Sequence, residues 1–179
     1  MTTNNCASII MLFLLTGCTS FNAAMTPGTE TIHDQFDGST IIRQEPVSAS
    51  SSLSEAWHML GFEWSTKRPE TVNITPGLAM QTETIQDVEF NVDGKIISSA
   101  KLASSHTEYG NMASNRRLSL PIAEFRKIAE GRNVKMKVTY DFGNKYSVSS
   151  FGQDLPDAIV SGKIKLFMTQ IDGLRNTKQ

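Results

Sequence analysis

The chain has 179 residues, of which 39% are hydrophobic and 20% are charged, and its formal net charge is −1. This length fits one ordinary globular domain with a core of its own, and no second domain is needed. Two cysteines are too few for a disulfide framework, and the near-neutral charge gives no reason to expect a nucleic-acid partner.

The N-terminal segment is apolar and uncharged from about residue 7, and it ends in the motif Leu15-Thr16-Gly17-Cys18. Such a run is too short to span a bilayer as a helix of the mature protein, and small residues before a cysteine mark a peptidase site. The pattern predicts an export signal over residues 1–17, with cleavage between Gly17 and Cys18. The alternative is a buried apolar strand that happens to contain a cysteine.

The motif resembles the lipobox of the bacterial lipoproteins, which is a Leu, a small residue, Gly or Ala, and then Cys. The resemblance implies a diacylglyceryl group on the Cys18 thiol and an N-acyl chain, such as palmitate, on the new amino terminus. Two or three chains meet the requirement for about two lipid signals in a stable anchor. Thr19 stands where enteric-type lipoproteins of the inner membrane have Asp, so the resemblance favours the outer membrane, with the domain facing the periplasm.

The mature chain is expected to have two parts. Residues 18–30 show no hydrophobic periodicity and include Pro27 and Gly28, which indicates a flexible tether that spans roughly 20 Å. Residues 31–179 form a single periplasmic-type globular domain. Cys6 leaves with the signal and the Cys18 thiol is blocked by lipid, so the domain must be stabilised by its apolar core. No cofactor is expected beyond the covalent diacylglycerol and the N-acyl chain.

Alternating apolar residues and turn dipeptides predict strands through most of the domain. Asp37-Gly38 and Asp93-Gly94 predict hairpin turns, Pro46 and Pro76 are expected to end strands, and residues 47–54 and 110–115 read as loops. The predicted strands cover residues 32–36, 40–43, 57–64, 71–75, 85–92, 95–97, 117–120, 134–140 and 146–150. The fold class that follows is α+β, mainly β, with an antiparallel sheet or sandwich of about seven strands.

Two segments have the apolar spacing of amphipathic helices. A short helix is predicted over residues 121–130, where Pro121 can occupy the first position and Gly131 ends it. A longer helix is predicted over residues 156–174 near the C-terminus. The expected buried stripes consist of Ile122, Phe125, Ile128 and Ala129 in the first helix, and of Val160, Ile164, Phe167, Met168 and Ile171 in the second.

Charge is distributed unevenly along the chain. Residues 18–108 contain twelve acidic and five basic residues, whereas residues 116–145 contain eight basic and three acidic residues. This asymmetry suggests one basic face, able to meet anionic headgroups, lipopolysaccharide or an acidic partner. Its candidate members are Arg116, Arg117, Lys135, Lys137 and Lys145. The alternative is that these side chains only solubilise a strand or protect a sheet edge.

The titratable side chains give little indication of catalysis. His33, His58 and His106 have no partner at metal-ligand spacing, so no metal site is expected. His106 and Glu108 would share one face of a regular strand, and a serine nearby would complete a hydrolase site. No G-x-S-x-G motif frames such a site, so we expect a solvated pair and no catalytic residues.

Three classes of function follow from these observations. The favoured one is a non-catalytic, lipid-anchored envelope protein that interacts with another envelope protein or with an anionic polymer. The second is a periplasmic module that binds an apolar or sugar ligand, with Trp57 and Trp64 as stacking surfaces. For these two rings a position in the core is the favoured interpretation. A lipid-anchored hydrolase is a weaker alternative. The resemblance covers only the first twenty residues or so, and no family resemblance was found in the domain.

Overall fold

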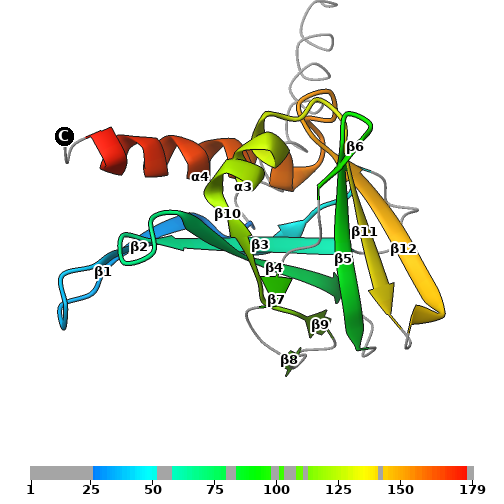
Figure 1. Cartoon of the computed structure of the whole chain (residues 1–179), viewed down its shortest axis with the longest axis horizontal. Helices are drawn as coiled ribbons and strands as arrows, with labels where there is room; N and C mark the ends of the chain where they lie inside the picture. The colour runs from blue at the N-terminus through cyan, green and yellow to red at the C-terminus, as the bar shows by residue number, and fades with distance from the viewer. Residues whose placement is uncertain are drawn as a thin grey trace, which may run out of the picture.

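The computed structural model describes residues 26–51, 58–79, 84–97, 101–102, 108–110, 113–140 and 143–176. The motif Leu15-Thr16-Gly17-Cys18 and Trp57 lie outside these ranges. The described chain forms two antiparallel sheets of eight and four strands, together with two helices (Figure 1). The predicted class, α+β and mainly β, is confirmed. The strand number exceeds the expected seven because several strands have only two or three residues.

The larger sheet, which we call sheet A, has the strand order β1-β2-β3-β4-β10-β7, and β9 pairs with both β4 and β8. Its strands are β1 (Thr29–His33), β2 (Thr40–Ser48), β3 (His58–Ser65), β4 (Thr71–Ala79), β7 (Lys101–Leu102), β8 (Glu108–Gly110), β9 (Ala113–Asn115) and β10 (Leu118–Pro121). The first four are neighbours in chain order, whereas β10 reaches β4 from a distant part of the chain.

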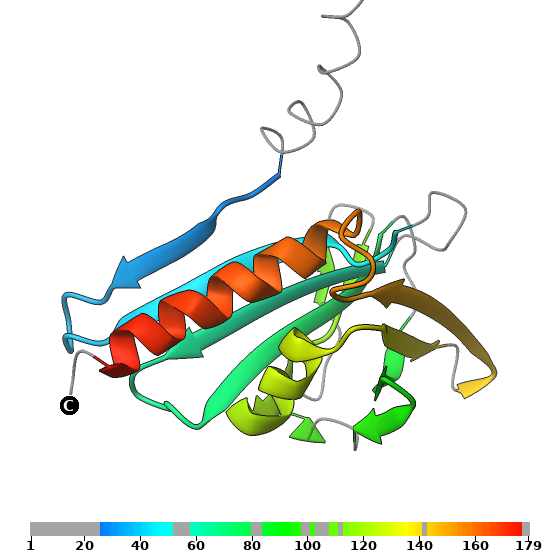
Figure 2. The same ribbon diagram turned by 90° about the horizontal axis from the view of Figure 1, so that it is seen from above.

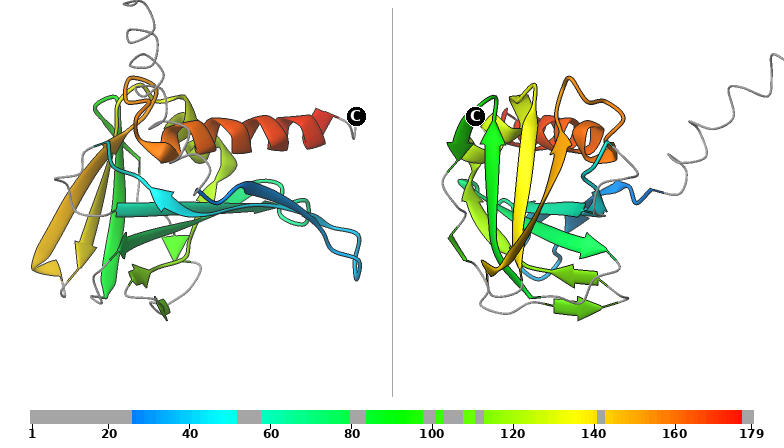
Figure 3. Two further views of the ribbon diagram at one scale, coloured as in Figure 1. Left: turned by 180° about the vertical axis from the view of Figure 1, so that it is seen from behind. Right: turned by 90° about the vertical axis from the view of Figure 1, so that its right-hand side faces the viewer.

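The smaller sheet, which we call sheet B, has the order β12-β11-β5-β6 and stands across one end of sheet A (Figures 1 and 3). Its strands are β5 (Ile85–Val92), β6 (Lys95–Ile97), β11 (Val134–Tyr140) and β12 (Lys145–Phe151). The predicted hairpin at Asp93-Gly94 is confirmed, since both residues have the positive φ angles of a primed turn, 51° and 88°. The Asp93 carboxylate accepts the backbone N–H groups of Arg132 and Asn133, which lower its pKa.

Both predicted helices are present. Helix α3 (Ile122–Glu130) begins one residue after Pro121, and helix α4 (Ile159–Asn176) lies within three residues of its predicted bounds at each end. The two helices lie on the same face of sheet A (Figure 2). The residues that they bury are those of the predicted stripes, because a 3.6-residue repeat brings such residues to one face. Only Ala129 is partly exposed.

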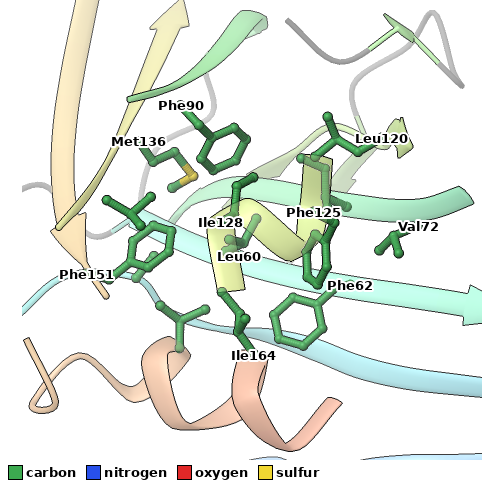
Figure 4. Close-up of a cluster of buried hydrophobic side chains, with 14 of the residues drawn as sticks. Leu60, Phe62, Val72, Phe90, Leu120, Phe125, Ile128, Met136, Phe151 and Ile164 are labelled. Atoms are coloured by element: carbon green, nitrogen blue, oxygen red, sulfur yellow. The ribbon is translucent and has the colours of Figure 1, made fainter. Parts of the chain in front are cut away.

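Three phenylalanines join sheet A to both helices, and Figure 4 shows two of them, Phe62 and Phe125, in the buried cluster. The ring centroids of Phe62 in β3 and Phe167 in α4 are 4.7 Å apart, and Phe125 in α3 lies 5.6 Å from the first ring and 5.7 Å from the second. All three pairs are tilted or edge-to-face, which are the favoured aromatic geometries. The buried apolar cluster continues through Phe90 and Met136 into sheet B, so both sheets share one core.

The predicted strand ends at two prolines are wrong. Strand β2 passes through Pro46 at a bulge, where Gln44 pairs with Phe62 and Val47 pairs with Leu60. A bulge leaves one residue outside the hydrogen-bond ladder, so a missing N–H costs nothing there. Strand β4 passes through Pro76, where its neighbour changes from β10 to β9. At that break the Pro76 carbonyl accepts the N–H of Arg116.

Three local predictions also need correction. The first hairpin turn covers residues 34–39, so Phe36 lies in the turn rather than in a strand, and β1 begins inside the predicted tether. Residues 47–48 belong to β2, with Val47 buried, instead of opening a loop. The predicted loop over residues 110–115 contains β9 and the end of β8. Pairing with a neighbouring strand explains the early start of β1, the extension of β2 and the presence of β9.

Candidate functional site

The predicted row of lysines lies on the outer face of sheet B. Lys135 and Lys137 occupy alternate positions of β11 and point away from the core, as expected. The Lys137 ammonium group donates to Glu89 at 2.8 Å and lies 5.4 Å from the ring centroid of Tyr146. The hydrogen bond to Glu89 raises the pKa of Lys137. Glu89 neutralises the charge of one of the two lysines, so the row is less basic than the sequence suggests.

The two predicted arginines lie on the link between β9 and β10, next to sheet A. The Arg116 guanidinium donates to the carbonyls of Ile85 and Gln86, so it serves to join sheet A to β5. Arg117 lies 3.9 Å from Glu63, on the outer face of sheet A. These arginines therefore contact groups that are separate from the lysine row on sheet B.

Lys145 does not extend the lysine row either. It pairs with Tyr140 across the β11–β12 ladder. Side chains alternate between faces along a strand, so Lys145 shares the inner face of β12 with Phe151 and not the outer face with Lys137. The single five-residue basic patch is therefore not formed. Charge counts along a sequence cannot show this, because the register of pairing decides which face each residue occupies.

The predicted aromatic surface is not available at Trp64. Its side chain is only 2% exposed, and its indole Nε1 donates to the carbonyl of Pro69 at 3.0 Å. A buried ring with a satisfied N–H is a core residue. The interpretation of Trp64 as a core anchor is confirmed, and its use as a stacking surface is wrong. Trp57 lies outside the described residues, so its role stays a prediction.

The histidines occupy unrelated positions. His33 is exposed and lies 3.1 Å from the hydroxyl of Thr40. His58 is fully buried, and its Nε2 lies 2.9 Å from the hydroxyl of Ser147. A serine beside a histidine is the geometry of an activated nucleophile, but a substrate cannot reach an imidazole without exposed surface. Sequence reasoning missed this contact because 89 positions separate the two residues. His106 lies outside the described residues.

The candidate site that the fold does create is a groove of about 600 Å³ between α3 and α4. Its floor is apolar and its rim is charged, a combination that suits ligands with an apolar body. Across the rim, Arg126 of α3 donates twice to Asp172 of α4, at 2.6 and 3.1 Å, and so lowers the pKa of that carboxyl. The apolar residues that line the groove are Ile128, Ala129, Phe151, Pro156, Ile164 and Met168.

Gly162 keeps one wall of this groove open. It lies in the second turn of α4, is exposed, and has nothing within 4 Å of the place where a Cβ would lie. Glycine inside a helix costs about 0.5–1 kcal/mol relative to alanine. The packing of α4 therefore does not require a glycine at position 162. The absence of a side chain there does leave the groove unobstructed. No local pattern of residues indicates this groove, since its two walls come from separate parts of the chain.

The entry of the chain into the domain is fixed at Pro27. Its carbonyl accepts hydrogen bonds from the Lys163 ammonium group of α4 at 2.9 Å and from the Gln44 amide of β2 at 3.2 Å. Thr29 donates to the same Gln44 side chain at 2.7 Å. Gln44 is only 1% exposed, so this polar junction is part of the packed structure. The segment that leads to Cys18 therefore starts from a defined point between β2 and α4.

Within the described ranges, no three His, Cys, Asp or Glu side chains gather as a metal ion would require. No helix in that same part of the chain is both long and apolar enough to cross a membrane. In comparisons with known proteins, no family model matches the chain, and no curated protein matches it by sequence.

Proposed function

We propose that this protein is a non-catalytic lipoprotein of the bacterial cell envelope, anchored in the outer membrane by acyl chains on Cys18. Its domain faces the periplasm and binds another envelope protein or an anionic envelope polymer. The observation that carries this proposal is the motif Leu15-Thr16-Gly17-Cys18, which resembles the lipobox at every position. Neither a metal nor a cofactor takes part.

The junction at Pro27 supports the proposal by limiting how far the domain extends from its anchor. Pro27 follows Cys18 by nine positions, and a fully extended chain of that length spans about 30 Å. A domain that is fixed at Pro27 therefore works close to the membrane surface. This arrangement suits an interaction protein whose partner lies in, or next to, the same membrane.

Replacement of Cys18 by serine should release the protein from the membrane fraction. Each buried methylene of an acyl chain contributes about 0.8 kcal/mol to membrane binding, so loss of all chains removes the anchor. The measurement is fractionation of cells after a high-salt wash, with incorporation of labelled palmitate as a second readout. Cys6→Ser is the matched control, since Cys6 leaves with the signal and its loss should change neither readout. If the Cys18→Ser protein pellets with the membranes as fully as the wild type does, the anchor is refuted.

The groove favours a second candidate function, binding of an apolar ligand. A leucine at position 162 should fill part of the groove and weaken the binding of an apolar fluorescent dye by about tenfold. Gly173→Leu is the matched control, because Gly173 lies in the same helix with open space around it but does not line the groove. Equal dye affinity in both variants would exclude the groove as the binding site.

A further inference from the structure

Phe36 is the most exposed large hydrophobic residue among those that the structure describes. Its side chain is 96% exposed, and it lies in the turn between β1 and β2. Figure 2 shows this turn at the same end of the molecule as the C-terminal end of α4. Single exposed apolar residues are common on proteins, so exposure alone carries no inference. The inference about Phe36 depends on the contacts within the β1–β2 turn, on the charges around this turn and on the distance along the chain from Cys18 to Phe36.

The turn holds Phe36 in a defined position. The Asp34 carboxylate accepts the N–H of Phe36 at 2.8 Å, and the Asp34 carbonyl accepts the N–H of Gly38 at 2.9 Å. The Asp37 carboxylate accepts the N–H of Ser39 at 2.9 Å and forms an ion pair with Lys67 in the β3–β4 turn. The contacts with Lys67 and Ser39 lower the pKa of Asp37 to about 2. The backbone at Phe36 is held by these hydrogen bonds, so ordering it on binding costs little entropy.

Two basic side chains near Phe36 are held in ion pairs. Lys67 is bound to Asp37, and Arg175 at the end of α4 forms an ion pair with Glu70 at 3.0 Å, while the Asp34 carboxylate accepts the N–H of Phe36. An apolar ring whose neighbouring cations are paired is suited to enter the interface of a bilayer, because fewer charged groups must be desolvated singly. A contact of this kind depends weakly on salt, in contrast to a contact made by a basic row.

Chain geometry places Phe36 within reach of the membrane that would hold Cys18. Strand β1 carries the chain from the junction at Pro27 toward the turn, and it is the edge strand of sheet A. At about 3.3 Å per residue, the nine steps from Pro27 to Phe36 span at most about 30 Å. The segment from Cys18 to Pro27 has the same number of residues. Both ends of β1 can therefore lie against one bilayer.

We propose that Phe36 is a second membrane contact, which inserts into the bilayer that holds acylated Cys18 and orients the domain with the β1 edge toward the lipid. The inference rests on the proposed lipid anchor. The tether supplies the high local concentration of lipid at which even one aromatic side chain remains in contact. The outer face of sheet B and the groove between α3 and α4 are then left accessible to a partner.

Photo-crosslinking in cells tests this contact on the full chain. A benzophenone amino acid at position 36 keeps an aromatic ring at the tip, and the same residue at position 95 is the control. Lys95 is exposed in sheet B, away from β1. We expect a covalent adduct with one phospholipid at position 36, roughly tenfold more abundant than at position 95 and unchanged in 1 M salt.

The outcomes separate this inference from the anchor itself. Fractionation of wild type and of Cys18→Ser reports on the anchor, whereas the phospholipid adduct reports on Phe36. A protein that is membrane-bound but forms no phospholipid adduct at position 36 overturns the inference alone. Equal adducts at positions 36 and 95, or adducts at position 36 only with a protein or a second copy of the chain, overturn it too.

Discussion

Replacement of Phe167 by alanine is expected to destabilise the domain by about 3–5 kcal/mol. The Phe167 ring is fully buried in α4 and contacts Phe62 in β3 and Phe125 in α3, so its removal leaves a cavity where sheet A and both helices meet. For a domain of this size, such a loss lowers the melting temperature by roughly 10 °C or more. Thermal unfolding followed by circular dichroism measures the shift.

Leu166→Ala is the matched control for this prediction. Leu166 is the preceding residue of α4, but its side chain is 45% exposed, so little contact is lost on truncation. We expect a change of less than about 1 kcal/mol, as for most surface substitutions. If both variants unfold at the same temperature, Phe167 does not occupy the centre of the core and the packing of α4 on sheet A is wrong.

Gly152→Ala is expected to cost about 3 kcal/mol or more, because two separate penalties act at this position. Gly152 has a φ of +125°, a conformation that side chains disfavour. A Cβ there would lie 2.6 Å from the Arg132 carbonyl oxygen, so the turn that leads from β12 to α4 would have to move away from the link between α3 and β11. Chemical denaturation gives the change in the free energy of unfolding.

Gly143→Ala isolates the conformational part of that cost. Gly143 has a φ of +86°, but a Cβ there would meet nothing within 4 Å. A non-glycine residue in this region costs about 1–2 kcal/mol, so Gly143→Ala should be clearly less destabilising than Gly152→Ala. Similar losses for the two variants would show that the close approach of Arg132 and Gly152 is relaxed in solution.

Local patterns in the sequence predicted the elements that depend on local physics. The helix stripes at Phe125 and Phe167 follow a 3.6-residue repeat, and β11 alternates between apolar and polar residues over its whole length. The Asp93-Gly94 turn needs positive φ angles that these two residue types tolerate. Each of these signals is read within about ten residues, so no knowledge of the tertiary structure was required.

Features that depend on distant pairing could not be predicted in this way. Pro46 and Pro76 are tolerated because of a bulge and a change of neighbouring strand, which only the assembled sheet creates. Lys145 is not part of the predicted basic patch, because the register of β12 against β11 places it on the other face of sheet B from Lys137. The groove requires α3 and α4 to lie side by side, and the His58–Ser147 contact joins residues from different sheets. No local pattern in the sequence encodes these contacts between distant segments.

The place of α4 in the chain has a consequence for the order in which the domain folds. Strands β1 to β4 come first, and α4, which packs on β2 and β1, follows all the other elements. Contacts between such distant segments form late, because closing a long loop costs entropy. Until α4 docks, the part of sheet A that it covers in the folded domain stays open to solvent. An intermediate that exposes this apolar surface is the form of the chain that would associate with other chains or with a chaperone.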